Sequence, residues 1–198
     1  MIALFIALAA TATTPQGKLI PKQVVVAEFG DCLVRTAPRA TGRLLMTPLG
    51  SSEEARLAHE VSRAGRTCLG GRPGLSLRTG AIRGAIAEAA LARDGAVAAR
   101  ARALTATVAD RPARANGRAF VIAYATCLVH SDPARSLTQL GQAIASQEER
   151  AAFLGFGDAL TRCMPEKVRY NVDVTDVRNH IAAVLYQDAR GRTEADNA

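Results

Sequence analysis

Four cysteines are the residues whose chemistry and spacing say most about this chain. Cys32 and Cys68 lie 36 positions apart (68 − 32), and so do Cys127 and Cys163 (163 − 127). Zinc sites usually contain closely spaced cysteine pairs, and this sequence has none. A catalytic cysteine needs a basic neighbour and access to solvent. We therefore interpret the cysteines as structural disulfides, which are typical of an oxidising compartment, with metal binding and thiol catalysis as the alternatives.

The spacing of the cysteines also favours one pairing. Four cysteines allow three pairings. Cys127 follows Cys32 by 95 positions (127 − 32), and Cys163 follows Cys68 by the same distance. Duplication of a gene segment copies a local pair intact, so we expect Cys32–Cys68 and Cys127–Cys163. On the chain-entropy estimate each bridge would stabilise the fold by about 3–4 kcal/mol.

The sequence around the cysteines is itself repeated. FGDCLVRTAP at residues 29–38 is nearly matched by YATCLVHSDP at residues 124–133. The same register continues without a gap and aligns both cysteines, a proline and a Ser-x-Glu-Glu group. The chain is therefore predicted to be a tandem duplication.

Apolar residues recur at helical spacing on either side of each cysteine. Val25, Phe29 and Cys32 share one helix face, and Leu57, Val61 and Cys68 share another. The second copy repeats both patterns, with Phe120, Tyr124 and Cys127 on one face and Ala152, Phe156, Ala159 and Cys163 on the other. Aromatic residues make up only 4% of the chain and Trp is absent, which favours close-packed helices over a β-sandwich.

Two paired carboxylates stand in the first turn of the third predicted helix of each copy. Glu54 stands three residues after Ser51, and Glu149 stands three residues after Ser146. Paired carboxylates can perform acid–base catalysis, but a serine followed by such a glutamate is also a helix capping box. We interpret both groups as caps.

These patterns predict an all-α fold made of two similar units of about four helices each. The units are expected to pack with pseudo-two-fold symmetry and to hold one disulfide each. The predicted organisation is a signal peptide (1–12), a first unit (18–95), a linker (96–117), a second unit (118–187) and a mobile tail (188–198).

The first residues predict export. MIALFIALAATA is uncharged and too short to span a bilayer, but it fits the apolar stretch of a secretory signal with small residues for cleavage after Ala12. No basic residue precedes Lys18, which is atypical of such a signal. We expect a periplasmic or secreted protein, with a cytoplasmic chain as the alternative.

The net charge is +7, and most of the positively charged residues are arginine. Arg35, Arg39 and Arg43 would form a stripe if one helix continued through Pro38. A basic surface attracts anionic lipid, acidic polysaccharide or nucleic acid. The arginines are interspersed with acidic residues and no aromatic residues alternate with them, so nucleic acid is not expected and weak contact with an anionic surface is the alternative.

Arg83 and Arg178 are the arginines that the two copies share. We expect each to bond carbonyls or a carboxylate between helices, and the alternative is a pair of anion-binding sites. His59, His130 and His180 show no metal-ligand spacing.

No catalytic residue, metal site or cofactor is predicted, because the chain has no phosphate loop, nucleophile elbow, dinucleotide fingerprint or zinc-protease motif. A hydrolase using Glu88, Asp31 or His59 is an alternative, because the counterparts of these residues in the other copy differ, but no spacing joins the three.

The pattern of a leader followed by two units, each with Cys, a Ser-x-x-Glu helix, Cys and an arginine-containing helix, resembles small exported proteins of bacteria with a duplicated helical unit. The resemblance covers residues 25 to 187 and implies no activity. We expect a non-enzymatic protein of the cell envelope that binds or supports a partner, and neither the partner nor the oligomeric state is predicted.

Overall fold

The computed structural model of this protein describes residues 20–70, 77–166 and 171–195, and it is helical as predicted, with no strand in those ranges. The elements are α1 (Lys22–Thr36), α2 (Pro38–Met46), α3 (Ser52–Ala64), the 3₁₀ helix η1 (Gly65–Leu69), α4 (Thr79–Arg93), α5 (Gly95–Arg102), α6 (Gly117–Ser131), α7 (Pro133–Leu140), α8 (Gln147–Leu154), α9 (Asp158–Arg162) and α10 (Val174–Ala195). The predicted signal peptide at 1–12 lies outside the described residues. Among the described helices, none combines the length and the apolar character that crossing a membrane requires.

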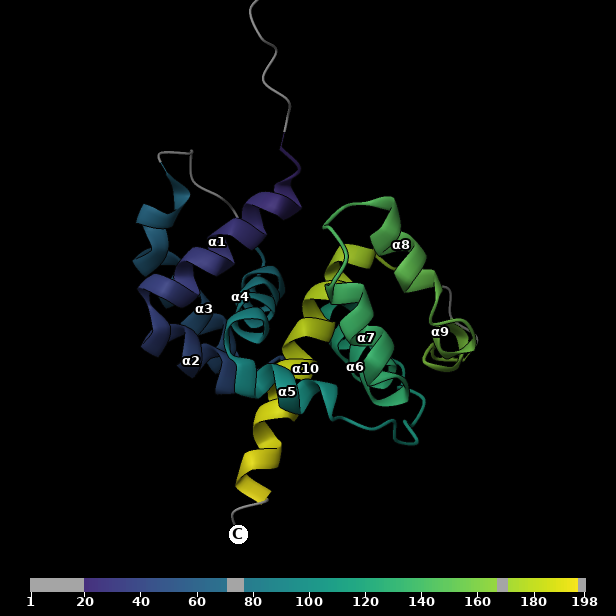
Figure 1. The fold of residues 1–198 in the computed structure, drawn as a ribbon. Helices are drawn as coiled ribbons and strands as arrows, with labels where there is room; N and C mark the ends of the chain where they lie inside the picture. Colours follow the sequence, from purple (N-terminus) through teal and green to yellow (C-terminus); the bar gives the residue numbers. More distant parts are fainter. Residues whose placement is uncertain (1–19, 71–76, 167–170, 196–198) are drawn as a thin grey trace, which may run out of the picture.

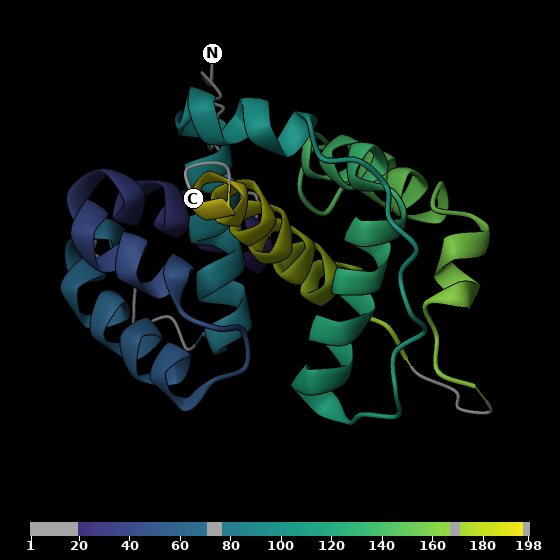
Figure 2. The same cartoon turned by 90° about the horizontal axis from the view of Figure 1, so that it is seen from below.

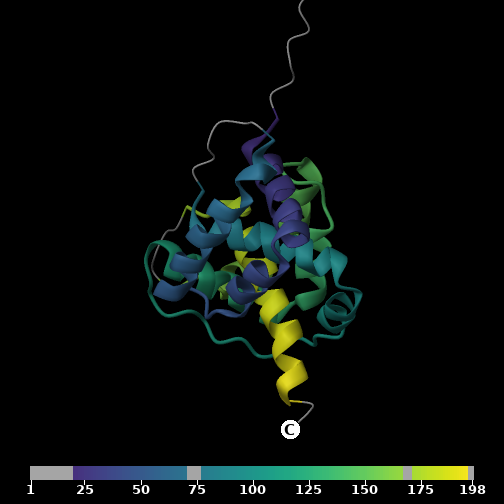
Figure 3. The same cartoon turned by 90° about the vertical axis from the view of Figure 1, so that its left-hand side faces the viewer.

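The structure has a first half (residues 20–102) and a second half (residues 117–195), and each half contributes one helix to a central pair (Figures 1 and 2). That pair is α4 and α10, which make the most extensive helix contact of the molecule. The helices α1, α2 and α3 pack on one side of it, and α6 to α9 lie on the other (Figure 1). The far end of α10 extends beyond the body of the protein (Figure 3).

One hydrophobic core runs through both halves. Leu33, Leu44 and Val61 of the first half belong to the same buried cluster as Leu128 and Ile181 of the second. Burial of such aliphatic side chains contributes about 1.5–3 kcal/mol each. The two halves are therefore held together by shared apolar packing as well as by the polar contacts described below.

Local signals explain where α2, α3, α7 and α8 begin. Pro38 and Pro133 stand at the first position of α2 and α7, where a missing N–H is harmless. The hydroxyl of Ser51 accepts a hydrogen bond from the Glu54 N–H at 3.1 Å, and Ser146 accepts from Glu149 at 3.0 Å. The predicted serine caps are confirmed.

The disulfides pair as predicted, Cys32 with Cys68 and Cys127 with Cys163. The Cα atoms are 5.7 and 5.6 Å apart, within the usual range for a bridge. The first bridge ties α1 to η1, and the second ties α6 to the residue that ends α9. Two disulfides and no free cysteine among the described residues are what an oxidising environment produces.

Two details of the helices differ from the sequence prediction. The third helix of the second half is broken into α8 and α9, because Gly155 ends α8 and Gly157 adopts a φ of 54°. The buried face of α1 consists of Val26, Phe29 and Leu33, one step away from the predicted face with Val25 and Cys32.

Helices also extend into the predicted linker and the predicted tail. Within 96–117, Val97 and Ala101 of α5 are fully buried, so the connection without regular structure is shorter. The predicted tail begins inside α10, which continues to Ala195, and Ala189 is fully buried. Helix packing buries Ala189 although the sequence around it shows no apolar stripe.

Candidate binding site between the two halves

Arg83 of α4 is fully buried and holds partners from its own half. Its Nη2 donates hydrogen bonds to the carbonyl oxygens of Leu45, at 2.7 Å, and Thr47, at 2.6 Å. Its Nη1 lies 3.3 Å from Oε1 of Glu54, which is also fully buried. Glu54 in turn accepts from the Gly50 N–H at 2.8 Å, so its carboxylate does more than cap α3.

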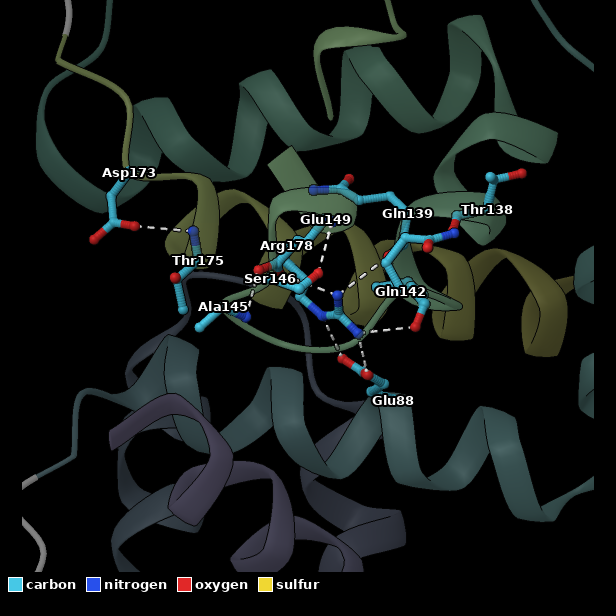
Figure 4. A network of polar contacts seen from close by, with 11 residues as sticks. Glu88, Thr138, Gln139, Gln142, Ala145, Ser146, Glu149, Asp173, Thr175 and Arg178 are labelled. Atoms are coloured by element: carbon cyan, nitrogen blue, oxygen red, sulfur yellow. Dashed lines mark hydrogen bonds and ion pairs between the residues drawn. The ribbon is translucent and has the colours of Figure 1, made fainter. Parts of the chain in front are cut away.

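Arg178 of α10 has a closely related set of partners (Figure 4). It donates to the carbonyl oxygens of Gln139, at 3.1 Å, and Leu140, at 2.8 Å. Its Nη1 lies 3.0 Å from Oε1 of Glu149. Both guanidinium groups therefore bond carbonyls and a carboxylate between helices, as the sequence led us to expect, and internal partners occupy them.

Each arginine–glutamate pair receives a third charge from the opposite half. Arg118 of α6 donates from Nη2 to Oε1 of Glu54 at 2.5 Å. Glu88 of α4 accepts from Nε of Arg178 at 3.0 Å and from its Nη2 at 2.6 Å, a bidentate pairing. Figure 4 shows Glu88 reaching Arg178 from the side opposite Glu149.

The two three-residue groups have opposite net charge. The Arg83 cluster (Arg83, Glu54 and Arg118) has two cations and one anion, which leaves one positive charge. The Arg178 cluster (Arg178, Glu149 and Glu88) has one cation and two anions, which leaves one negative charge. Because Glu88 and Arg118 each come from the opposite half, both clusters join the halves.

The surroundings shift the pKa of the two arginines in opposite directions. Burial lowers the pKa of Arg83, which Glu54 partly offsets and the nearby Arg118 reinforces. Burial also acts to lower the pKa of Arg178, but its hydrogen bonds and charge interactions with Glu88 and Glu149 raise that pKa above its usual value. A guanidinium remains protonated in proteins, so both clusters keep the charges given above.

His180 of α10 lies beside the Arg83 cluster and is buried. Its Nδ1 is 2.7 Å from the carbonyl oxygen of Asp176 and must therefore donate to it, while Nε2 has no hydrogen-bond partner among the described residues. Burial lowers the pKa of His180, and the positive charge of Arg118 lowers it further, against the raising effects of Asp176 and Glu54. The folded protein therefore favours the neutral imidazole.

This shift predicts how stability depends on pH. Because the folded state depresses the pKa of His180 below its ordinary value of 6.5, the unfolded chain takes up the proton at a higher pH. The free energy of unfolding should be highest above about pH 7.5 and should decrease as the pH falls through 6.5, by at most about 1.4 kcal/mol per pH unit. Urea unfolding followed by circular dichroism at several pH values measures this.

Two variants assign the effect to this side chain. His180→Gln should lose most of the slope between about pH 7.5 and 5.5, whereas His59→Gln, at an exposed position, should retain it. A wild-type stability that stays level or rises as the pH falls through this range would contradict the prediction.

A cleft of about 250 Å³ opens at the seam where α1, α4 and the start of α10 meet. Its walls carry the charged and amide side chains of Lys22, Gln23, Arg78, Glu88, Asp173, Asp176, Arg178 and Asn179. Its apolar surface is formed by Val26, Ala27, Leu77, Ala81, Ala85 and Ile144. A concave site with an apolar surface and a few polar groups is the usual form of a small-molecule site.

Comparison with protein-family models, with curated proteins and with solved structures finds no match to this chain. The arrangement of its own side chains is therefore what bears on function.

The hydrolase candidates do not come together. Glu88 lines the cleft, but both of its carboxylate oxygens accept hydrogen bonds from Arg178. Asp31 pairs with Arg93 at 2.6 Å on another part of the surface, and His59 lines a separate hollow between α3 and α4. Among the described residues, no group of His, Cys, Asp and Glu is placed to hold a metal ion.

The arginine stripe does not form on one helix. α1 ends at Thr36 and α2 begins at Pro38, so Arg35 lies on a different helix from Arg39 and Arg43. Arg35 pairs with Asp31 at 3.3 Å, and Arg43 pairs with Glu60 at 2.5 Å. Two of the three cations are thus paired within the surface.

Sequence reasoning missed Arg118 and His180 as members of the buried polar network, and it gave Glu54 and Glu149 a capping role alone. One signal was available for the glutamates, since each recurs together with the shared arginine at matching positions of the two copies. No local signal marks Arg118, because its partner Glu54 lies 64 residues away in the chain.

Proposed function

We propose that this protein is an exported, disulfide-stabilised binding protein of the cell envelope, without enzymatic activity, and that its ligand occupies the cleft. Export to the periplasm or beyond the cell is supported by the two disulfides and by the apolar leader. Mass spectrometry of the exported protein under non-reducing conditions tests this part, because it reads the mature N-terminus and the bridges together.

We also propose that the two halves arose by tandem duplication and pack with pseudo-two-fold symmetry. Helices α1, α2, α3 and α4 begin 95 positions before α6, α7, α8 and α10, respectively. A methyl group added at Gly84 would come within 2.5 Å of the Cα atom of Asn179, its counterpart in the repeat. Contact between a residue and its own counterpart is what a two-fold axis between α4 and α10 would produce.

The observation that carries the binding proposal is that the cleft departs from this symmetry. Gln23, Ala85 and Thr175 line the cleft. Their counterparts on the other side are Arg118, His180 and Gly80. His180 and Arg118 lie against Gly80, since an added methyl there would be 3.0 Å from Nε2 of His180 and 3.5 Å from Nε of Arg118. Large side chains thus occupy one side of the seam, and the other side is left open.

The open side favours binding over hydrolysis. A hydrolytic carboxylate must be free to exchange a proton or to attack, and Glu88 is held by two hydrogen bonds from Arg178. Binding of a ligand requires neither proton exchange nor attack, and the shape and the polar groups of the cleft are sufficient for it.

A fragment screen by NMR on the full chain with its disulfides intact tests the binding proposal. Fragments should shift the amide signals of the cleft, and Ala81→Leu, which places a larger side chain in it, should abolish those shifts. Ala151→Leu, on the exposed surface of α8, is the matched control and should leave them unchanged. A screen without a hit at the cleft, or hits that persist in Ala81→Leu, would count against the proposal.

A further inference from the structure

The Arg178 cluster, which borders the cleft, has an unbalanced charge. The Arg178 cluster carries one negative charge in excess, and the exposed part of that cluster is Glu88, whose side chain is 25% exposed against 3% for Arg178 and for Glu149. Glu88 lines the cleft together with Asp173 and Asp176. The cleft is lined by three carboxylates and three cations, but two of the cations, Lys22 and Arg78, are exposed at its rim. Inside the cleft the carboxylates share Arg178 alone, so the site favours an added cation.

The other side of the seam contains such a cation. There, Arg118 places its guanidinium 2.5 Å from the buried carboxylate of Glu54 and gives that cluster its positive charge. The repeat counterpart of Arg118 is Gln23, which is neutral and lines the cleft. On the cleft side, therefore, no arginine takes the place of Arg118. The two carboxylates of Glu88 and Glu149 share the single guanidinium of Arg178.

The cations at the rim do not remove this imbalance. The side chain of Arg78 is 86% exposed and approaches Asp176 only to 3.4 Å. Lys22 is also exposed. Exposed ion pairs of this kind are weak and are screened by salt, so a ligand could displace Arg78 from Asp176 at little cost.

We propose that the cleft binds a small organic cation that carries an ammonium or guanidinium group on a short alkyl chain. The inference rests on the proposed function, whose ligand class it specifies. The cationic group donates hydrogen bonds to the carboxylates of Glu88 and Asp176, and the alkyl chain lies on Val26, Ala81 and Ile144. A volume of about 250 Å³ suits a ligand smaller than a typical drug.

Calorimetric titration of the full, oxidised chain with four butyl compounds tests the ligand class. Butylammonium and butylguanidinium should bind saturably, with affinity that falls as salt rises. Butyrate and 1-butanol, which match them in alkyl length, should bind at least about tenfold more weakly, equivalent to about 1.4 kcal/mol. Equal binding of butyrate or butanol at the cleft would overturn the cation assignment and leave the cleft as a ligand site.

Two variants place the binding at these residues. Gln23→Arg introduces at the cleft the counterpart of Arg118, so the protein's own guanidinium should compete and weaken butylguanidinium binding by about tenfold or more. Asp176→Asn should weaken it by a similar factor through loss of a charge and supplies the readout if Gln23→Arg fails to fold. Gln147→Arg, an identical change at an exposed position of α8, is the control and should bind as the wild type does.

The outcomes separate the two levels of the proposal. Cation binding that is unaffected by Gln23→Arg and by Asp176→Asn would place the cation elsewhere and overturn the inference. Absence of binding by all four butyl compounds, while other fragments bind the cleft, would overturn the ligand class alone. Absence of any binding at the cleft would overturn the proposed function as well.

Discussion

Replacing Arg178 by methionine is expected to destabilise the protein by about 3–5 kcal/mol, because it removes one partner of a buried ion pair. Glu149 would lose its only cationic partner among the described residues, and Glu88 would lose both hydrogen bonds that hold it. The carbonyl oxygens of Gln139 and Leu140 would lose donors as well. Urea unfolding of the oxidised protein at pH 7, followed by far-ultraviolet circular dichroism, measures the change.

The equivalent replacement in the other half is the matched comparison. Arg83→Met removes a fully buried guanidinium too, but Glu54 would keep its ion pair with Arg118. We therefore expect a smaller loss, about 1–3 kcal/mol, which is the usual cost of leaving buried carbonyls unsatisfied. Equal losses of stability for the two variants, or a larger loss for Arg83→Met, would contradict this reasoning. Such a result would show that Arg118 and Glu88 do not influence how much stability each replacement removes.

Removing either disulfide is expected to destabilise the protein by about 3–4 kcal/mol, and removing both by about 7 kcal/mol. The reason is the entropy that each bridge removes from the unfolded chain, and the two bridges close loops of equal length, with a sequence separation of 36. A domain of this size usually has a total stability of about 5–15 kcal/mol, so loss of both bridges should remove about half of it or more. Urea unfolding of Cys32→Ala/Cys68→Ala and of Cys127→Ala/Cys163→Ala measures each contribution.

Burial should distinguish the two bridges in a second measurement. Cys127 and Cys163 are 4% and 0% exposed, whereas Cys32 and Cys68 are partly exposed. Mild reduction of the folded protein should therefore break Cys32–Cys68 first, because thiol–disulfide exchange requires access to a sulfur atom. Reduction of Cys127–Cys163 first, or double variants that unfold at the wild-type urea concentration, would contradict this account of the bridges.

Several elements could be predicted because their causes are local. Ser51 and Ser146 cap helices with a donor three residues away, and proline at the first turn needs only its own ring geometry. The break between α8 and α9 also has a local cause, in Gly155 and Gly157. The sequence prediction missed it because apolar residues continue at helical spacing from Ala152 to Cys163.

Residues 187–189 of α10 show the opposite case. Their sequence has no apolar stripe, yet Ala189 is fully buried and Gln187 donates to the carbonyl oxygen of Thr47 at 3.0 Å, 140 residues away in the chain. Arg100 similarly donates to the carbonyl oxygen of Ala189. An alanine and two polar side chains make these contacts, so they leave no apolar stripe in the sequence, and nothing there argued against a mobile tail.

The amino-acid sequence by itself determined the helical class, the helix caps and the pairing of the four cysteines, because each follows from residues close together in the chain or from a constant spacing. Only the tertiary structure decided that Arg118 joins Glu54, that Glu88 joins Arg178, and that one side of the seam stays open. Those features depend on how α4, α6 and α10 pack. Packing decides which charges and side-chain volumes from distant segments meet at the seam, and residues that are neighbours in the sequence do not reveal it.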